Sequence, residues 1–378
     1  MRTLNLAISC FTLLTSAVIQ ASVIDLSGMG YVQYGDGQSY SLPISQIQDD
    51  CTSPGCPYHV SSTPGQIKDL IVVATGAAGA DVNSNFAGMD DAYTTPSGES
   101  GSNFFSTGTV ADPTAEPDFV GDADATWDAT LASLMSFLNG DDMVFMFNNN
   151  NLNGANLQSL AAWMQITLTD DQGQVFKTYD FTNDNNPYAL ISEGGGGTFM
   201  GDVTSYTSDG SGPDGNTNSD TDYVLSGGPL CINTDTPVPI PVPCDGSGIL
   251  PVSEGPINHN LGADEVAYAV LFPELNLELA DLFSSLTVEE LGLYTLNIDL
   301  RLGCDESLFS ATAEDELCTG EVSGFGKNLN NGYEQLFIST ATPPVQATEP
   351  KPSWLVLTTL ALLIIIAIKK HQKQFNLK

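Results

Sequence analysis

The alternation of hydrophobic and polar positions predicts that this chain is built mainly from β-strands. The clearest strand covers residues 296–302, where leucine or isoleucine stands at every even position and a polar side chain at every odd one. Alternating segments at 31–34 and 38–42 flank Gly35-Asp36-Gly37, which predicts a hairpin. Compact apolar runs predict further buried strands at 69–75, 143–147 and 163–168.

Helical periodicity is confined to two short segments. From Trp127, apolar residues recur at helical spacing as far as Leu138, and Asn139-Gly140 ends the pattern. A second helix is predicted to open just after Pro273 and to continue to Leu286. Many short strands, abundant turn residues and two short helices predict a mainly β fold, a β-sandwich of jelly-roll character with long loops.

The first 21 residues have the pattern of a secretory signal peptide. Arg2 precedes an apolar stretch that ends near Ile19, and the small residue Ala21 stands at a suitable cleavage position. We therefore expect signal peptidase to remove residues 1–21. The exported, β-rich region is then 22–340, and the low-complexity stretch 205–222 is the expected place for any subdivision of it.

The opposite end has three consecutive parts. Residues 341–353 form a linker with a polar, proline-punctuated motif, Glu349-Pro350-Lys351-Pro352. An apolar run at 354–368 is predicted to be a transmembrane helix, about 22 Å long at ~1.5 Å per residue. Residues 369–378 are a basic tail that includes Lys369, Lys370 and Lys373. These lysines favour a cytoplasmic C-terminus, with everything upstream of the span outside.

The order of Glu-Pro, short apolar helix and terminal basic cluster resembles the PEP-CTERM sorting signal, here in a variant form. The resemblance implies a surface protein of a Gram-negative bacterium, processed by an exosortase-like enzyme. Four further stretches resemble segments of surface proteins with such tails: 69–76, 85–93, 145–151 and 258–263. The resemblance implies an exported protein that is held at least transiently by the inner membrane and then placed at the cell surface or in the extracellular matrix.

The exported region is strongly acidic. Residues 22–348 carry 45 acidic and four basic side chains, a formal charge of −41. Such a charge repels nucleic acids and excludes them as partners. It also makes divalent cations natural counter-ions, although a merely well-solvated surface explains the same composition.

Six cysteines remain after the predicted cleavage, as three pairs of neighbours in sequence. In an exported protein, local pairing is the simplest arrangement and would staple three loops. Zinc is disfavoured because no Cys-x-x-Cys is present and only two histidines lie in the region. The expected disulfide cysteines are Cys51 with Cys56, Cys231 with Cys244, and Cys304 with Cys318.

Calcium is the one cofactor that the sequence suggests. Oxygen-bearing side chains alternate through 214–222 as in the start of a calcium loop, but Ser219 and Leu225 replace the glycine and glutamate that an EF-hand requires. The candidate ligands are Asp214, Asn216, Asn218, Asp220 and Asp222. A second acidic group, Asp122, Asp124 and Asp128, is interpreted as stabilising the N-terminus of the adjacent predicted helix.

The sequence predicts that the protein is not an enzyme. Gly-x-Ser-x-Gly, His-Glu-x-x-His and phosphate-binding loops do not occur in the chain. The leading interpretation is therefore a non-catalytic surface or matrix protein associated with exopolysaccharide. The alternative is a calcium-assisted carbohydrate-binding or adhesion module. A third class, a secreted polysaccharide hydrolase, would need a catalytic carboxylate pair among the 45 acidic residues.

Overall fold

The computed structural model describes residues between 24 and 342, with gaps. Its longest continuous stretches are 31–43, 119–148, 158–181 and 266–303. The chain divides into two compact units, Met1–Thr342 and Pro343–Lys378. Every residue described below belongs to the first unit.

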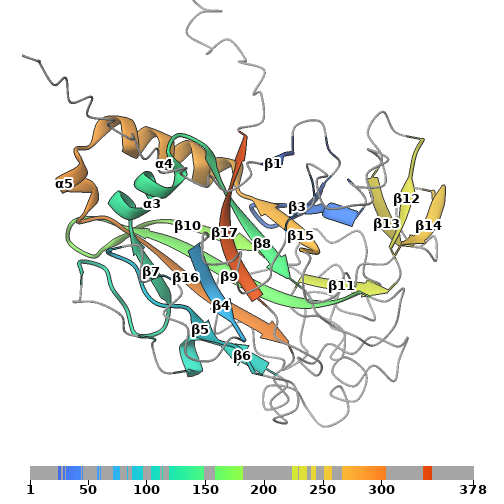
Figure 1. The fold of residues 1–378 in the computed structure, drawn as a ribbon, viewed down its shortest axis with the longest axis horizontal. Helices are drawn as coiled ribbons and strands as arrows, with labels where there is room; N and C mark the ends of the chain where they lie inside the picture. The colour runs from blue at the N-terminus through green and yellow to red at the C-terminus, as the bar shows by residue number, and fades with distance from the viewer. Residues whose placement is uncertain are drawn as a thin grey trace, which may run out of the picture. The chain divides into compact units, whose positions relative to one another are not determined.

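The fold is mainly β, as the alternation predicted, and its largest sheet has eight strands (Figure 1). The main strand order is β2-β3-β15-β8-β17-β4-β5, and β1 pairs in parallel with β17. The bounds are β1 Ile24–Asp25, β2 Val32–Tyr34, β3 Gly37–Ser41, β4 Ile71–Thr75, β5 Tyr93–Thr94, β8 Asp142–Asn148, β15 Tyr268–Leu271 and β17 Gln335–Thr342. The predicted hairpin is confirmed as β2–β3, and the predicted strands at 69–75 and 143–147 are confirmed as β4 and β8.

A second sheet has six strands around the long pair β9 and β16. Its order is β10-β9-β16-β6, with β11 also on β9 and β7 also on β16. The bounds are β6 Phe104–Ser106, β7 Trp127–Thr130, β9 Gln158–Thr169, β10 Val175–Phe181, β11 Val224–Gly228 and β16 Thr295–Gly303. The strands predicted at 163–168 and 296–302 are therefore confirmed, and they pair with each other in antiparallel register. The strands on either side of 205–222, β10 and β11, both pair with β9.

A small third sheet carries the one described cysteine. Its strands are β12 Leu230–Asn233, β13 Ile240–Pro243 and β14 Glu254–Ile257, in the order β13-β12-β14. Cys231 is buried and disulfide-bonded, and it lies opposite Val242 in the β12–β13 register. The predicted partner Cys244, one residue beyond β13, and the other predicted disulfide cysteines lie outside the described residues.

The two large sheets bury their side chains in a shared core. Even-numbered residues of β9 and β16, among them Ile166 and Ile298, join Phe145 of β8 and Ile338 of β17 in one hydrophobic cluster. The opposite side of the eight-stranded sheet has its own cluster, which includes Val144 and Phe337. Alternation along each strand thus decides which of the two clusters a side chain joins.

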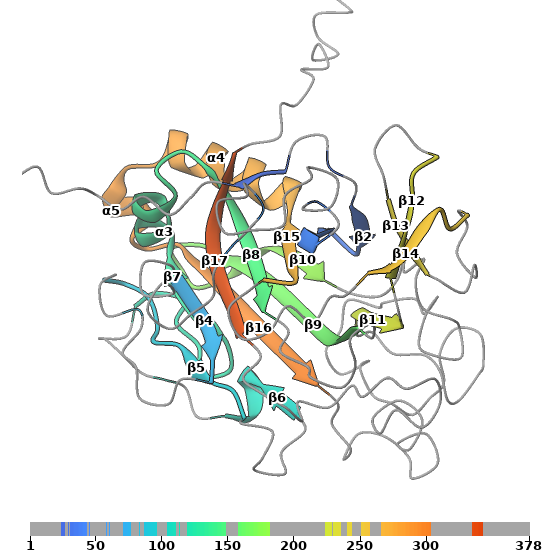
Figure 2. The ribbon, with the colours of Figure 1, turned by 45° about the vertical axis from the view of Figure 1, so that its right-hand side comes forward.

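A short 3₁₀ helix, η1 Thr107–Thr109, and three α-helices are described, and the α-helices group at one end of β8 and β17 in both views (Figures 1 and 2). They are α3 Leu131–Leu138, α4 Pro273–Ser285 and α5 Val288–Leu291. Both predicted helices are confirmed, and Asn139 ends α3 in the left-handed conformation. The first prediction began too early, because residues from Trp127 to Thr130 form β7, and Thr130 caps the helix instead.

Two buried asparagines take the place of neighbouring strands. Pairing of β15 with β8 stops at Val144, and Asn276 of α4 then bonds both backbone groups of Met143, at 2.8 and 3.0 Å. Asn83 has the same role beside β4. Its side chain forms hydrogen bonds with the N–H and the C=O of Val72, at 2.8 and 2.7 Å. Side-chain amides can do this because they carry a donor and an acceptor, as a peptide unit does.

Several sequence predictions concern residues that the structure does not describe. These are the signal peptide, the 205–222 stretch, the sorting motif, the 354–368 span and the basic tail. Among the described residues, no helix is long and apolar enough to cross a membrane.

Candidate metal centre

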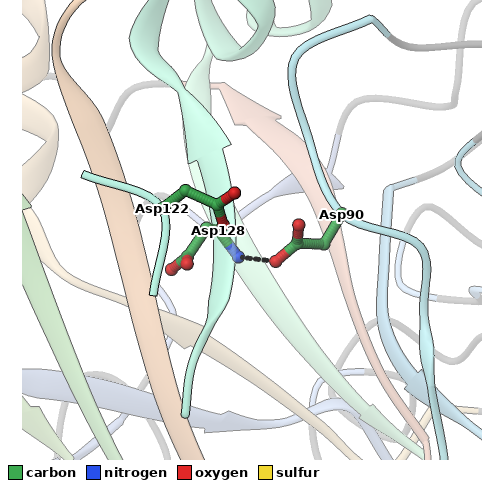
Figure 3. A group of neighbouring side chains, drawn as sticks. All are labelled: Asp90, Asp122 and Asp128. Carbon is green, nitrogen blue, oxygen red and sulfur yellow. Dashed lines mark hydrogen bonds between the residues drawn. The ribbon is translucent and has the colours of Figure 1, made fainter. Parts of the chain in front are cut away.

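Three aspartates from separate segments meet beside the six-stranded sheet. One carboxylate oxygen each of Asp90, Asp122 and Asp128 lies within 4.8 Å of the others. Asp90 and Asp122 approach Asp128 from two other segments of the chain (Figure 3). Asp128 is fully buried, Asp90 is nearly so, and Asp122 is half-buried. Like charges at this spacing are unfavourable unless a proton or a cation compensates them.

The strand β7 positions Asp128. Its apolar neighbours Trp127 and Ala129 point into the shared core, so alternation directs Asp128 to the opposite side of the sheet. There β7 pairs with β16, and Asp128 lies directly across from Asn297. The carboxylate accepts hydrogen bonds of 2.7 Å from the backbone N–H of Ala123, the hydroxyl of Thr126 and Nδ2 of Asn297.

Asp90 reaches the site through a short antiparallel contact with β7. Met89 and Ala129 form an isolated bridge, and the Asp90 N–H donates to the Asp128 carbonyl at 2.9 Å. The Asp128 N–H returns a bond to Oδ2 of Asp90 at 2.7 Å. Asn83 also donates to the Asp90 carbonyl at 2.8 Å, which ties this segment to β4.

Asp122 lies in a turn whose backbone depends on Gly121. That glycine has φ of +85°, a conformation that costs a residue with a Cβ. Its carbonyl accepts a 2.6 Å hydrogen bond from Nδ2 of Asn297, so the turn rests on β16. A Cβ at this position would lie 2.3 Å from Oγ1 of Thr169. The turn therefore approaches the sheet as closely as glycine allows.

The electrostatics of the group centre on Asp128. The pKa of its carboxyl is raised to about 7, mainly by burial and to a smaller extent by the charge of Asp122, against the opposing effect of its three hydrogen bonds. Within the described part of the chain, the basic side chains are Lys177 and Arg301. They lie 3.1 Å from Glu278 and 3.5 Å from Asp299, in ion pairs of their own.

An arrangement of this kind suits a hard cation. Two oxygens on opposite sides of a Ca²⁺ ion are at most about 5.2 Å apart, because each lies at ~2.3–2.6 Å from it. The 4.8 Å limit of the aspartate group falls within that span. Carboxylates without imidazole or thiolate partners favour hard cations such as calcium, magnesium and manganese over zinc and copper.

Sequence reasoning found part of this group and misread it. The sequence prediction that Asp122 and Asp128 stabilise a helix N-terminus is wrong, because Asp128 lies in β7. Asp124 is exposed and is not part of the cluster. Asp90 was missed, although it lies in the 85–93 stretch. The five predicted ligands at 214–222 lie outside the described residues.

A second, half-buried acid, Asp299, lies two positions after Asn297 in β16, on the same side of the sheet. The Thr107 hydroxyl donates to it at 3.2 Å, and Arg301 pairs with it while lying over the Trp163 ring, 5.1 Å from the centroid. Across β9, Gln165 lies opposite Asp299 in register and bonds Asp180 at 2.9 Å. Burial raises the pKa of Asp299 in spite of Arg301 and the Thr107 hydrogen bond.

This raised pKa predicts a dependence of stability on pH. The folded chain holds the Asp299 proton more tightly than the unfolded chain, whose aspartate pKa is about 3.9. The resulting stabilisation is complete below that value and is lost as the pH rises through the folded-state pKa. We expect Asp299→Asn to remove this contribution to the slope of the unfolding free energy against pH. The slope is measured by urea unfolding at a series of pH values. Asp171→Asn, a matched change in an exposed turn, should keep the wild-type slope; equal slopes in all three proteins would contradict the prediction.

Comparison with known proteins points to a family and to no characterised relative. No curated protein and no solved structure matches the chain. A family model matches residues 24–301, which is most of the chain and includes all three aspartates. The chain therefore belongs to the family described as Domain of unknown function (DUF8239).

Proposed function

We propose that this protein is a non-catalytic component of the cell surface or extracellular matrix, exported by a Gram-negative bacterium and associated with exopolysaccharide. The observation that carries the proposal is the order of three features at the C-terminus. They are the Glu349–Pro352 motif, the apolar run 354–368 and the basic cluster that begins at Lys369. This order resembles a PEP-CTERM signal, so an exosortase-like enzyme is the expected partner.

Three properties of the region between the predicted signal peptide and the predicted sorting motif support export. The disulfide of Cys231 fits an oxidising compartment outside the cytoplasm. The formal charge of −41 favours a soluble, well-hydrated surface. The family match, 24–301, falls wholly between the predicted signal peptide and the predicted sorting motif.

The finer fold in this proposal is a β-sandwich of jelly-roll type. The shared core of the two large sheets supports two layers, since Phe145 of one sheet and Ile166 of the other belong to one cluster. Sandwiches of this kind present long loops at their ends and suit binding to extended polymers.

Mass analysis of the mature protein from its native host tests the proposal. We expect a chain that begins near residue 22 and ends within 349–353, because the signal peptidase and the sorting enzyme would each have cut once. Replacing Glu349 and Pro350 by alanine should retain the tail, whereas the matched variant Pro343→Ala should be processed normally. Peptides that continue to Lys378 in the wild-type protein would contradict exosortase processing, and an uncut N-terminus in the cytosol would contradict export.

A second candidate function is a calcium-assisted carbohydrate-binding or adhesion module. The specific observation in its favour is the aspartate group at Asp90, Asp122 and Asp128. Co-sedimentation with exopolysaccharide from the host should then require calcium and be lost in chelator. Co-sedimentation that is equal in both conditions would instead support association without a cation.

A further inference from the structure

The side chain of Asn297 supplies an observation independent of the aspartates. It is 4 % exposed and extends from β16 between Asp128 and the carbonyl of Gly121, to which its Nδ2 donates at 2.7 and 2.6 Å. Both partners are acceptors, so the amide cannot be flipped to place its oxygen there. The other end of the amide, Oδ1, is buried and accepts no hydrogen bond from the described residues. A buried amide oxygen without a partner requires an explanation, and a water or an ion beside it is one that would supply the missing partner.

We propose that this site binds one Ca²⁺ ion, with carboxylate oxygens of Asp90, Asp122 and Asp128 and the amide oxygen of Asn297 as its protein ligands. The three hydrogen bonds to Asp128 occupy three of its roughly four acceptor positions, which leaves one for a cation. A divalent ion would offset the three clustered negative charges and take the unused lone pair of the amide. This inference stands apart from export and from processing of the tail.

Calcium fits this oxygen set better than its competitors. Magnesium requires near-ideal octahedral geometry at ~2.0–2.1 Å and keeps several waters, which a site with two buried aspartates restricts. Zinc prefers nitrogen and sulfur ligands, and none belongs to the group. Calcium accepts irregular sets of carboxylate and amide oxygens, with waters completing the shell.

The ion would join segments that are distant in sequence. Asp90 follows the bridge at Met89, Asp122 belongs to the turn at Gly121, and Asp128 and Asn297 belong to two paired strands. Binding therefore orders the two connecting segments against the sheet, and the folded state gains stability that rises with the logarithm of the free calcium concentration once it exceeds the Kd.

Calorimetric titration of the full chain, purified in mild detergent and stripped with chelator, tests the proposal. We expect one Ca²⁺ per chain with a Kd of about 10⁻⁴–10⁻³ M, the range of extracellular calcium modules. Magnesium should bind at least about tenfold more weakly, and calcium should raise the melting temperature of the stripped protein. Absence of calcium binding at millimolar concentration would overturn the proposal.

Matched variants locate the site. Asp90→Asn keeps an oxygen to accept from the Asp128 N–H while removing the charge, so it should weaken calcium binding by about tenfold or more. Asp122→Asn, at the half-buried position, is a second variant that disturbs the fold less and should act in the same direction. Asp124→Asn, exposed in the following turn at 123–126, should bind as wild type does. If Asp220→Asn with Asp222→Asn abolishes binding while Asp90→Asn and Asp122→Asn do not, the ion lies in the 214–222 loop and the proposal is wrong.

Discussion

Replacing Gly121 by alanine is expected to destabilise the protein by about 2–5 kcal/mol. About 1–2 kcal/mol comes from forcing a residue with a Cβ to φ of +85°. A further ~1–3 kcal/mol comes from overpacking, since the new Cβ would lie 2.3 Å from Oγ1 of Thr169 and 3.0 Å from Cβ of Thr295. Urea unfolding of the variant and wild type measures the difference.

Gly140 provides the matched control for this prediction. Its φ is +97°, but a Cβ there would meet nothing within 4 Å. Gly140→Ala should therefore lose only the conformational part, about 1–2 kcal/mol. Adding Thr169→Ala to Gly121→Ala removes the clashing hydroxyl and should recover part of the packing loss, a coupling that a double-mutant cycle detects. Equal losses at Gly121 and Gly140 would contradict the close approach of the turn to the sheet.

Asn83→Ala is expected to cost about 3 kcal/mol. Its side chain is 1 % exposed and makes three hydrogen bonds of 2.7–2.8 Å, two to Val72 and one to the Asp90 carbonyl. Alanine would leave the buried N–H and C=O of Val72 without these bonds, and each such group costs ~1–3 kcal/mol. The loss falls at the point where β4 is held to the segment that carries Asp90.

Hydrogen exchange distinguishes this effect from a general loss of stability. The Val72 amide should lose protection in Asn83→Ala beyond the change in global unfolding, because its acceptor is the deleted Oδ1. The amides of β9 and β16 should follow the global change alone. A loss of unfolding free energy below about 1 kcal/mol, or unchanged protection of the Val72 amide, would show that the Asn83 side chain does not take the place of a neighbouring strand.

The aspartate group shows where sequence reasoning stops. Asp122 and Asp128 are six positions apart and form a visible acidic group in the sequence, but Asp90 is 32 positions before Asp122 and nothing local connects them. Because apolar residues recur at helical spacing from Trp127 onward, the sequence predicts that Asp128 lies at the start of a helix. Pairing with Asn297 in β16 overrides that local pattern and turns Asp128 into a buried strand residue.

By itself, the sequence determined some of the strands and helices that the structure describes. The hairpin β2–β3, the buried strands β4, β8 and β9, the alternating strand β16 and the helices α3 and α4 follow from side-chain period and turn residues. These signals are local, because a strand or helix exposes its pattern within a few residues.

Only the tertiary structure decided which elements are neighbours and what they bring together. The order of strands in each sheet, the two asparagines that replace missing strands and the meeting of Asp90, Asp122, Asp128 and Asn297 all join residues distant in sequence. Their positions depend on burying the two faces of the sheets in specific clusters and on pairing every buried backbone group. Those requirements are met by the whole chain at once, so no single segment encodes them.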